Sequence, residues 1–187
     1  EIQDPENFYI AFEKGWNPAT LIWDVRSEFP PSGLESDPRP PYIPDNFSRN
    51  YQGPVTVRTA LASSLNIPAV KTLQFVGVYD DPATPEKDGL VGMAERLGIT
   101  SLTRADYGLA LTLGGGDVSL LEMTGAYSVI ANSGLRQPSF SITRIVDFEG
   151  NIVYEHQPAA GEQVISTQHA FLITSILSDR IARAPTF

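Results

Sequence analysis

A serine and an asparagine two positions apart are the side chains best placed to do chemistry in this sequence. Ser64 and Asn66 lie in a turn between two predicted helices, residues 55–63 and 67–76, so both side chains can point into one cleft. A hydroxyl can relay a proton, and an amide can both donate hydrogen bonds to a peptide and accept them from it. The alternative is that Asn66 simply caps the second helix, and the two roles are compatible.

The histidines and the glycine run are better explained by structural roles. His156 and His169 have no metal-ligand spacing around them and are interpreted as structural or solvent-facing residues. Gly114-Gly115-Gly116 precedes a predicted helix, a place where an anion can bind. However, Asp117 follows instead of the lysine and hydroxyl residue of a phosphate loop, which favours a tight turn. We therefore expect no metal and no cofactor.

The charge and residue content exclude several kinds of partner and chemistry. The net charge of -9 argues against nucleic acid and against a polybasic membrane-binding patch. The 187 residues include no cysteine, which excludes disulfides, thiolate catalysis and Cys-ligated zinc. Asp45 and Asp80-Asp81 lie in proline-rich loops and are interpreted as solvated carboxylates, although spacing alone leaves a glycosidase-like acid pair open. Apolar runs are far below the ~18 residues that cross a bilayer.

The first half of the chain is predicted to combine helices with one long loop. Residues 8–14 form a helix that ends before Gly15. Residues 29–50 form an irregular, solvated loop that is rich in proline. Pro54 suits the first turn of the helix at 55–63. A further helix is predicted from Thr84, where a hydroxyl cap, a proline and an acid follow one another, to a stop at Gly98.

The second half is predicted to hold a buried helix, a hairpin and a last helix. Ser119 and Glu122 fit a capping box, and Val118 with Met123 fits a hydrophobic staple. The helix that follows, to Asn132, is apolar on nearly every side and is predicted to be buried. Residues 142–156 are predicted to form a hairpin, which must pack on helices or on strands missing from this chain, because a lone hairpin is unstable. The last helix starts near residues 166–167.

Several blocks of this sequence, in the right order, resemble the penicillin-binding transpeptidase family, and most closely the class A, bifunctional type that also carries a glycosyltransferase domain. In this family an S-x-x-K serine, a second serine-containing triplet and a K-T-G strand build the site. The resemblance implies that Ser64-Leu65-Asn66 is the middle triplet, with Ser64 as the proton-relay hydroxyl and Asn66 as the substrate-orienting amide. The blocks that carry the resemblance are residues 14–20, 51–70, 113–123, 126–128 and 131–134.

The other two motifs of the family are missing from this sequence. No serine has a lysine three residues later, and Lys71-Thr72 is followed by leucine within a predicted helix. We therefore expect residues 1–187 to be a partial transpeptidase domain, cut between the S-x-x-K and K-T-G motifs. Its fold would be mainly α with a small β-hairpin, the helical subdomain of the β-lactamase/transpeptidase-like fold without most of the central antiparallel sheet. A degenerate homologue is the alternative explanation of both losses.

The resemblance implies a function for the complete protein and a different state for this chain. The parent would be a membrane-anchored D,D-transpeptidase on the extracytoplasmic face that crosslinks peptidoglycan stem peptides and reacts with β-lactams. The isolated chain would be soluble, and it would be inactive because it lacks the nucleophile. It would self-associate through helical surfaces that a sheet normally covers. The alternative function is a non-catalytic scaffold that binds peptidoglycan or a partner.

Overall fold

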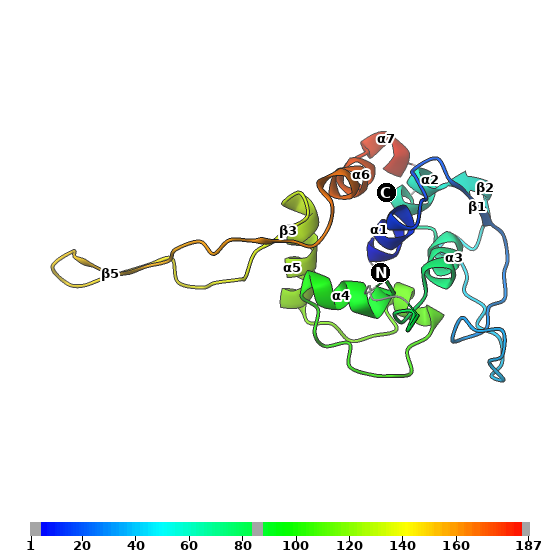
Figure 1. Cartoon of the computed structure of the whole chain (residues 1–187). Helices are drawn as coiled ribbons and strands as arrows, with labels where there is room; N and C mark the ends of the chain where they lie inside the picture. The colour runs from blue at the N-terminus through cyan, green and yellow to red at the C-terminus, as the bar shows by residue number, and fades with distance from the viewer. Residues whose placement is uncertain (1–4, 84–87, 185–187) are drawn as a thin grey trace.

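Helix α1 (Glu6–Glu13) lies at the centre of a mainly helical body (Figure 1). The computed structural model describes residues 5–83 and 88–184. All seven side chains from Glu6 to Phe12 are buried, because α1 packs against α3 (Asn66–Val76), α4 (Leu90–Leu97) and α6 (Thr167–Leu177). The helix predicted at residues 8–14 is confirmed and begins two residues earlier.

The strands are short and form only pairs. Three antiparallel two-stranded sheets are found in the described residues, β1–β2, β3–β6 and β4–β5, so the prediction of a mainly α fold with little sheet is confirmed. The remaining elements are β1 (Leu21–Asp24), β2 (Gly53–Thr56), α2 (Val57–Ala62), the 3-10 helix η1 (Leu109–Leu113), α5 (Leu120–Ala131), β3 (Leu135–Arg136), β4 (Arg144–Val146), β5 (Ile152–Glu155), β6 (Glu162–Gln163) and α7 (Arg180–Arg183).

The sheet β1–β2 replaces what was predicted as the start of a helix. Pro54 lies in β2 opposite Trp23 of β1, and α2 begins only at Val57. Thr56 caps α2, because its hydroxyl oxygen accepts a hydrogen bond from the backbone N–H of Thr59 at 3.2 Å. Proline is tolerated in β2 because each strand of a two-stranded sheet has an open edge, where a missing N–H breaks no ladder.

Helix α4 begins later than predicted. The expected start at residues 84–86 lies outside the described residues, but Asp88 and Gly89 are described and are not helical, so the helix begins at Leu90. A side chain at position 89 would place its Cβ 2.2 Å from the backbone carbon of Tyr79, which explains the glycine. The predicted stop at Gly98 is confirmed by its left-handed φ of +100°.

Helix α5 has the predicted N-terminus but not the predicted burial. The Ser119 hydroxyl accepts from the backbone N–H of Glu122, and the Glu122 carboxylate accepts from the backbone N–H of Ser119, each at 3.2 Å. The staple contact between Val118 and Met123 stays a prediction, although Val118 packs against the core. The prediction of a buried helix is wrong for this chain, because α5 packs on α4, α6 and β3 and leaves most of its side chains at least partly exposed. Three of its side chains are buried, Ala126, Val129 and Ile130.

Replacing Glu122 by glutamine is expected to remove a pH-dependent stabilisation. Hydrogen bonds from the backbone N–H of Thr100 and from the hydroxyls of Ser119 and Ser101 lower the Glu122 pKa from 4.5 to about 2. A carboxyl whose pKa is lowered by folding stabilises the protein above its unfolded pKa, and this stabilisation is lost as the pH falls through the folded pKa. Thermal unfolding of both proteins should show a Tm difference near pH 6 that closes towards pH 2. A Tm difference that does not change with pH would contradict the assignment.

Residues 142–156 form the predicted hairpin, but it projects from the body instead of packing on it. Strands β4 and β5 pair with Arg144 opposite Glu155, and every residue of both strands is exposed. Figure 1 shows this segment extending away from the helices, so the expectation that it packs on helices is wrong within the described residues. The alternative, packing on strands missing from this chain, stays a prediction. We call residues 137–161 the arm; the pair β3–β6 closes its base.

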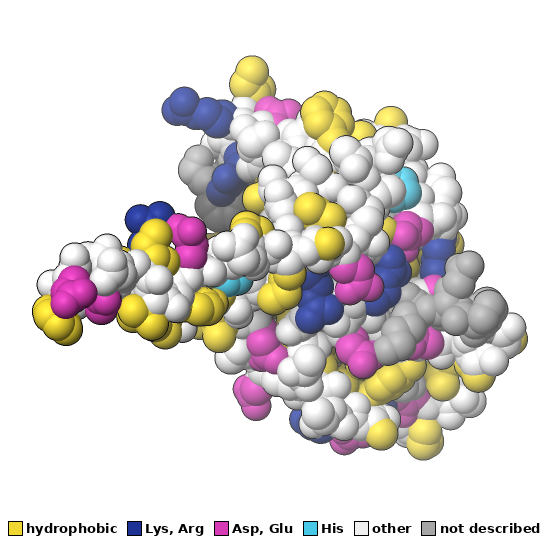
Figure 2. Space-filling view, turned by 60° about the vertical axis from the view of Figure 1, so that its left-hand side comes forward, with side chains coloured by type: hydrophobic (Ala, Val, Ile, Leu, Met, Phe, Trp, Pro, Cys, Tyr) yellow, Lys and Arg dark blue, Asp and Glu magenta, His cyan; other side chains and the backbone are white. Residues whose placement is uncertain are grey.

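Local contacts hold the arm together without a core. The Arg144 guanidinium contacts the Glu155 carboxylate at 2.5 Å, and the ring of Phe140 stacks on His156 with centroids 3.8 Å apart. In the turn, the Asp147 carboxylate accepts hydrogen bonds from the backbone and side chain of Asn151, each at 2.8 Å. Apolar side chains gather along one side of the arm (Figure 2), so the contacts that hold its shape leave an apolar surface open to solvent.

Candidate functional site

Ser64 forms the turn between α2 and α3, as predicted. Its φ of +52° places it in the left-handed region, which few residues other than glycine adopt. This conformation lets the backbone N–H of Leu65 donate to the carbonyl of Ala60 at 3.0 Å, so α2 is closed and α3 can start at once. The side chain is half-buried, and its hydroxyl makes no hydrogen bond to any described residue.

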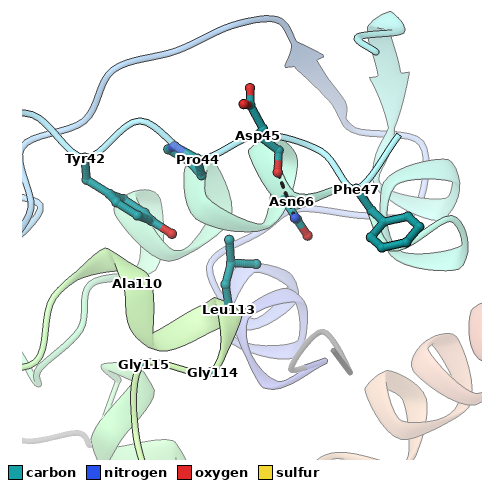
Figure 3. Close-up of a pocket in the computed structure, with 9 residues that line it drawn as sticks. All are labelled: Tyr42, Pro44, Asp45, Phe47, Asn66, Ala110, Leu113, Gly114 and Gly115. Atoms are coloured by element: carbon teal, nitrogen blue, oxygen red, sulfur yellow. Dashed lines mark hydrogen bonds between the residues drawn. The ribbon is translucent and has the colours of Figure 1, made fainter. Parts of the chain in front are cut away.

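Asn66 is the first residue of α3, and its side chain does not cap that helix. Its Nδ2 donates to the backbone carbonyl of Asp45 at 2.9 Å (Figure 3). The interpretation of Asn66 as a helix cap is therefore wrong, because Leu65 holds the cap position. A side chain from the loop before β2 instead accepts a hydrogen bond from the first turn of α3. The Oδ1 of Asn46 accepts from the backbone N–H of Ile67 at 3.2 Å.

A surface hollow of about 420 Å³ lies beside Asn66. Its walls are the loop residues 42–47 on one side and η1 with its glycine turn on the other (Figure 3). Ser64 is not among the residues that line it, so the structure brings only one member of the predicted pair to this hollow. The lining residues are Tyr42, Pro44, Asp45, Phe47, Asn66, Ala110, Leu113, Gly114 and Gly115.

The glycine run forms a tight turn, as interpreted from the sequence. Gly114 ends η1 in a left-handed conformation with φ +90°. A side chain at position 115 would place its Cβ 2.8 Å from the backbone of Ala110, so only glycine fits there. The turn therefore brings bare backbone to the edge of the hollow (Figure 3).

The acidic candidates shape loops. The Asp45 carboxylate points away from Asn66 (Figure 3) and accepts from the Tyr51 hydroxyl at 2.7 Å, a contact that raises the Tyr51 pKa. The Asp80 carboxylate accepts a hydrogen bond from the backbone N–H of Gly89 at 3.0 Å. The Asp81 carboxylate accepts one from the backbone N–H of Ala83 at 2.8 Å.

The histidines lie beside aromatic rings, and the Lys-Thr pair lies in a helix. His169 meets Tyr9 edge-on with centroids 5.6 Å apart, and His156 stacks on Phe140. Lys71 and Thr72 are in α3, as predicted, and the Lys71 amino group donates to the carbonyl of Trp23 at 2.7 Å. In residues 5–83 and 88–184, no cluster of three or more metal-binding side chains occurs, and no helix is long and apolar enough to cross a bilayer.

Two buried polar residues beside Asn66 were missed. Asp24 and Asn46 are 0% and 3% exposed, and the Nδ2 of Asn46 donates to the Asp24 carboxylate at 2.8 Å. Asn46 lies in the loop predicted to be solvated, and that prediction is wrong at this position. The only sequence signal was an asparagine shortly after Pro44, which is typical of any turn and does not indicate burial.

Comparison with known proteins identifies the family. The sequence model of the penicillin binding protein transpeptidase domain matches residues 30–184. Penicillin-binding protein 2D of Bacillus subtilis (strain 168) is 34% identical over 176 residues, which are 93% of this chain and 23% of that protein. Penicillin-binding protein 1A of Neisseria lactamica is 30% identical over 183 residues, which are 94% of this chain and 21% of that protein. The chain thus spans less than a quarter of the length of these relatives.

Solved structures show the same fold. Penicillin-binding protein 1A from Haemophilus influenzae matches 94% of this chain and 28% of its own with a TM-score of 0.80 and 23% identity. Penicillin-binding protein A from M. tuberculosis, solved as an imipenem acyl-enzyme complex, matches 97% of this chain and 42% of its own with a TM-score of 0.72 and 16% identity. The fold is therefore part of the transpeptidase fold, as predicted. This chain belongs to the penicillin-binding protein transpeptidase domain family, of which it is a partial domain.

Proposed function

We propose that this chain is the middle part of a peptidoglycan D,D-transpeptidase domain and supplies its Ser64-Leu65-Asn66 triplet. The observation that carries the proposal is the family match over residues 30–184, which contains the triplet at the turn between α2 and α3. The nucleophilic serine would lie outside these 187 residues, because no serine here has a lysine three residues later. Membrane anchoring and an extracytoplasmic location belong to the same proposal.

The proposed reaction passes through an ester on that serine. The serine oxygen attacks the penultimate D-alanine carbonyl of a stem peptide, the carbon–nitrogen bond breaks, and the terminal D-alanine leaves as an amine. The amine of a neighbouring stem peptide then attacks the ester, forms the crosslinking amide and frees the serine. A β-lactam would be opened by the same attack. The imipenem acyl-enzyme formed by penicillin-binding protein A from M. tuberculosis supports this chemistry.

The two triplet side chains would have separate roles. The Ser64 hydroxyl, which has no hydrogen-bond partner among the described residues, would pass a proton between the nucleophile and the leaving group. One N–H of Asn66 is held by the Asp45 carbonyl, so its other N–H and its carbonyl oxygen stay available to orient a peptide.

Labelling with a fluorescent penicillin tests the proposal. We expect label on the complete polypeptide that contains this segment and none on the 187-residue chain. In the complete polypeptide, Asn66→Ala should slow acylation by about 100-fold, the usual cost of removing one donor at an acyl-transfer site. The exposed Gln74 on the same helix gives the matched control, since Gln74→Ala should leave acylation unchanged. Absence of label on the complete polypeptide would favour the scaffold function, and label on the short chain would contradict its inactivity.

We also propose that the isolated chain self-associates through the open side of α5. Leu120 and Leu121 are 83% and 70% exposed on this helix, and Phe171 of the neighbouring α6 is 68% exposed. Adjacent exposed apolar side chains such as Leu120 and Leu121 favour association. Helix α5 lies at the margin of the body beside the base of the arm (Figure 1), so its outer side is accessible to a second copy.

A further inference from the structure

We infer that Asn46 is a positioning residue for the Ser64-Leu65-Asn66 triplet, and that the buried Asp24 fixes the orientation of its amide. The inference rests on the proposed function, because it concerns the same site, and it adds two residues that lie outside the family motif. It comes from the hydrogen bonds that join β1, the loop before β2 and the start of α3.

Asn46 satisfies the first turn of α3 from outside the helix. The first backbone N–H groups of a helix have no partner within it. In α3 the N–H of Ala69 already bonds to the carbonyl of Leu65, and Pro68 has none, so the N–H groups of Asn66 and Ile67 have no partner within the helix. The Oδ1 of Asn46 accepts from the N–H of Ile67 at 3.2 Å, and Asn46 and Ile67 are both buried. Since Asn66 immediately precedes Ile67, this bond fixes the backbone that carries the Asn66 side chain.

Asp24 determines which way the Asn46 amide faces. The Nδ2 of Asn46 donates to the Oδ1 of Asp24 at 2.8 Å and to the backbone carbonyl of Asn50 at 2.9 Å. The second carboxylate oxygen of Asp24 accepts from the backbone N–H of Gln52 at 2.8 Å. A carboxylate only accepts hydrogen bonds, so the amide must present its NH₂ group to Asp24 and its oxygen to Ile67. The reverse orientation would leave buried donors and acceptors unpaired.

The same two loop residues hold both the backbone and the side chain of Asn66. Asn46 binds the start of α3, while the neighbouring Asp45 offers its carbonyl to the Nδ2 of Asn66 at 2.9 Å. A movement of this loop would therefore shift the Asn66 amide relative to Ser64. Asp24 anchors the loop to β1, which is paired with β2 directly before α2.

A charge exchange between the two residues tests the inference on the 187-residue chain. In Asn46→Asp, two carboxyl groups face each other in a buried site. We expect hydrogen exchange of the Ile67 amide to rise about tenfold, since the two hydrogen bonds that the Asn46 amide donates are lost, and the side-chain NH₂ resonances of Asn66 to shift. The double variant Asp24→Asn with Asn46→Asp restores the hydrogen bond between the two side chains but not the one to the Asn50 carbonyl, so it should recover both signals in part. Asn50→Ala is the matched control, because only the Asn50 carbonyl takes part in the network.

A second variant and a second measurement keep the result decisive. Should Asn46→Asp fail to fold, Asp24→Asn alone provides a milder change, since one of the two donors at Asp24 loses its acceptor. Unchanged Ile67 exchange and Asn66 resonances in the variants that fold, or a double variant that recovers stability but neither signal, would overturn the inference. In the complete polypeptide, Asn46→Asp should slow penicillin acylation about tenfold with less effect on penicillin binding. Absence of acylation in the unsubstituted polypeptide would instead reject the proposed function, leaving the NMR result intact.

Discussion

The Gly134→Ala variant is expected to lose about 3 kcal/mol of unfolding free energy, a large effect for a single methyl group. Gly134 follows α5 with a φ of +87°, and a Cβ there would lie 2.0 Å from the carbonyl oxygen of Ile165. The backbone segments at Gly134 and Ile165 cannot move apart to relieve this contact, because the Gly134 carbonyl accepts hydrogen bonds from the backbone N–H groups of Val164 and Ile165 at 3.0 and 3.2 Å. Denaturation in urea, followed by circular dichroism, measures the loss.

The matched control for this prediction lies on α5 itself. A Cβ at Gly125 would meet no atom within 4 Å, so Gly125→Ala has space and a normal helical backbone. Alanine is favoured over glycine in helices, and the control should gain up to ~1 kcal/mol. Equal stabilities for the two variants would show that the contact between residues 134 and 165 does not constrain the fold.

Light scattering of the 187-residue chain should give a mass above the 20.4 kDa of the monomer that rises with concentration. Replacing both Leu120 and Leu121 with glutamine should return the mass to the monomer value, because the two side chains are the most exposed apolar residues of α5. Phe148→Gln is the matched control: Phe148 is 97% exposed but lies in the turn of the arm, and its change should leave the association as it was.

Two outcomes would contradict this second prediction in different ways. A monomer at every concentration would exclude self-association of the isolated chain. A monomer produced by Phe148→Gln, with the α5 variant still associated, would place the contact on the arm instead of the helix.

The helix ends were predictable because they depend on local sequence. Gly15 and Gly98 were each predicted to end a helix, and they have φ values of +96° and +100°. The capping box of Ser119 and Glu122 is also local, since its two residues are three apart. These signals lie within one or two turns of chain, whereas the local start signals at Pro54 and at residues 84–86 did not give the correct helix starts.

The wrong predictions concern strand pairing and side-chain burial, which depend on residues far apart in the sequence. The pairing of β1 with β2 joins Leu21 to Thr56, and nothing near Pro54 in the sequence reveals that partner. The apolar character of α5 suggested burial on every side, but the pattern does not contain the surface that would cover Leu120 and Leu121. The hairpin was predicted in the correct place, and its projection into solvent was not.

The turn that carries the candidate residues was predictable in its position but not in its contacts. The turn at Ser64 and Asn66 between two helices was correctly placed. The role of Asn66 as a cap was wrong, because the capping bond to Ile67 comes from Asn46, twenty-one residues earlier. A side chain that reaches across the fold in this way leaves no periodic or short-range signal in the sequence.

The left-handed turn at Ser64 has a consequence for the thermodynamics of the whole domain. Glycine would adopt the φ of +52° without steric penalty, whereas a residue with a Cβ is less stable there by about 1 kcal/mol. Serine at this position therefore lowers the folding stability and supplies a hydroxyl that glycine lacks. With glycine the turn would be more stable, and the chain nevertheless carries a half-buried hydroxyl there, between the end of α2 and the start of α3.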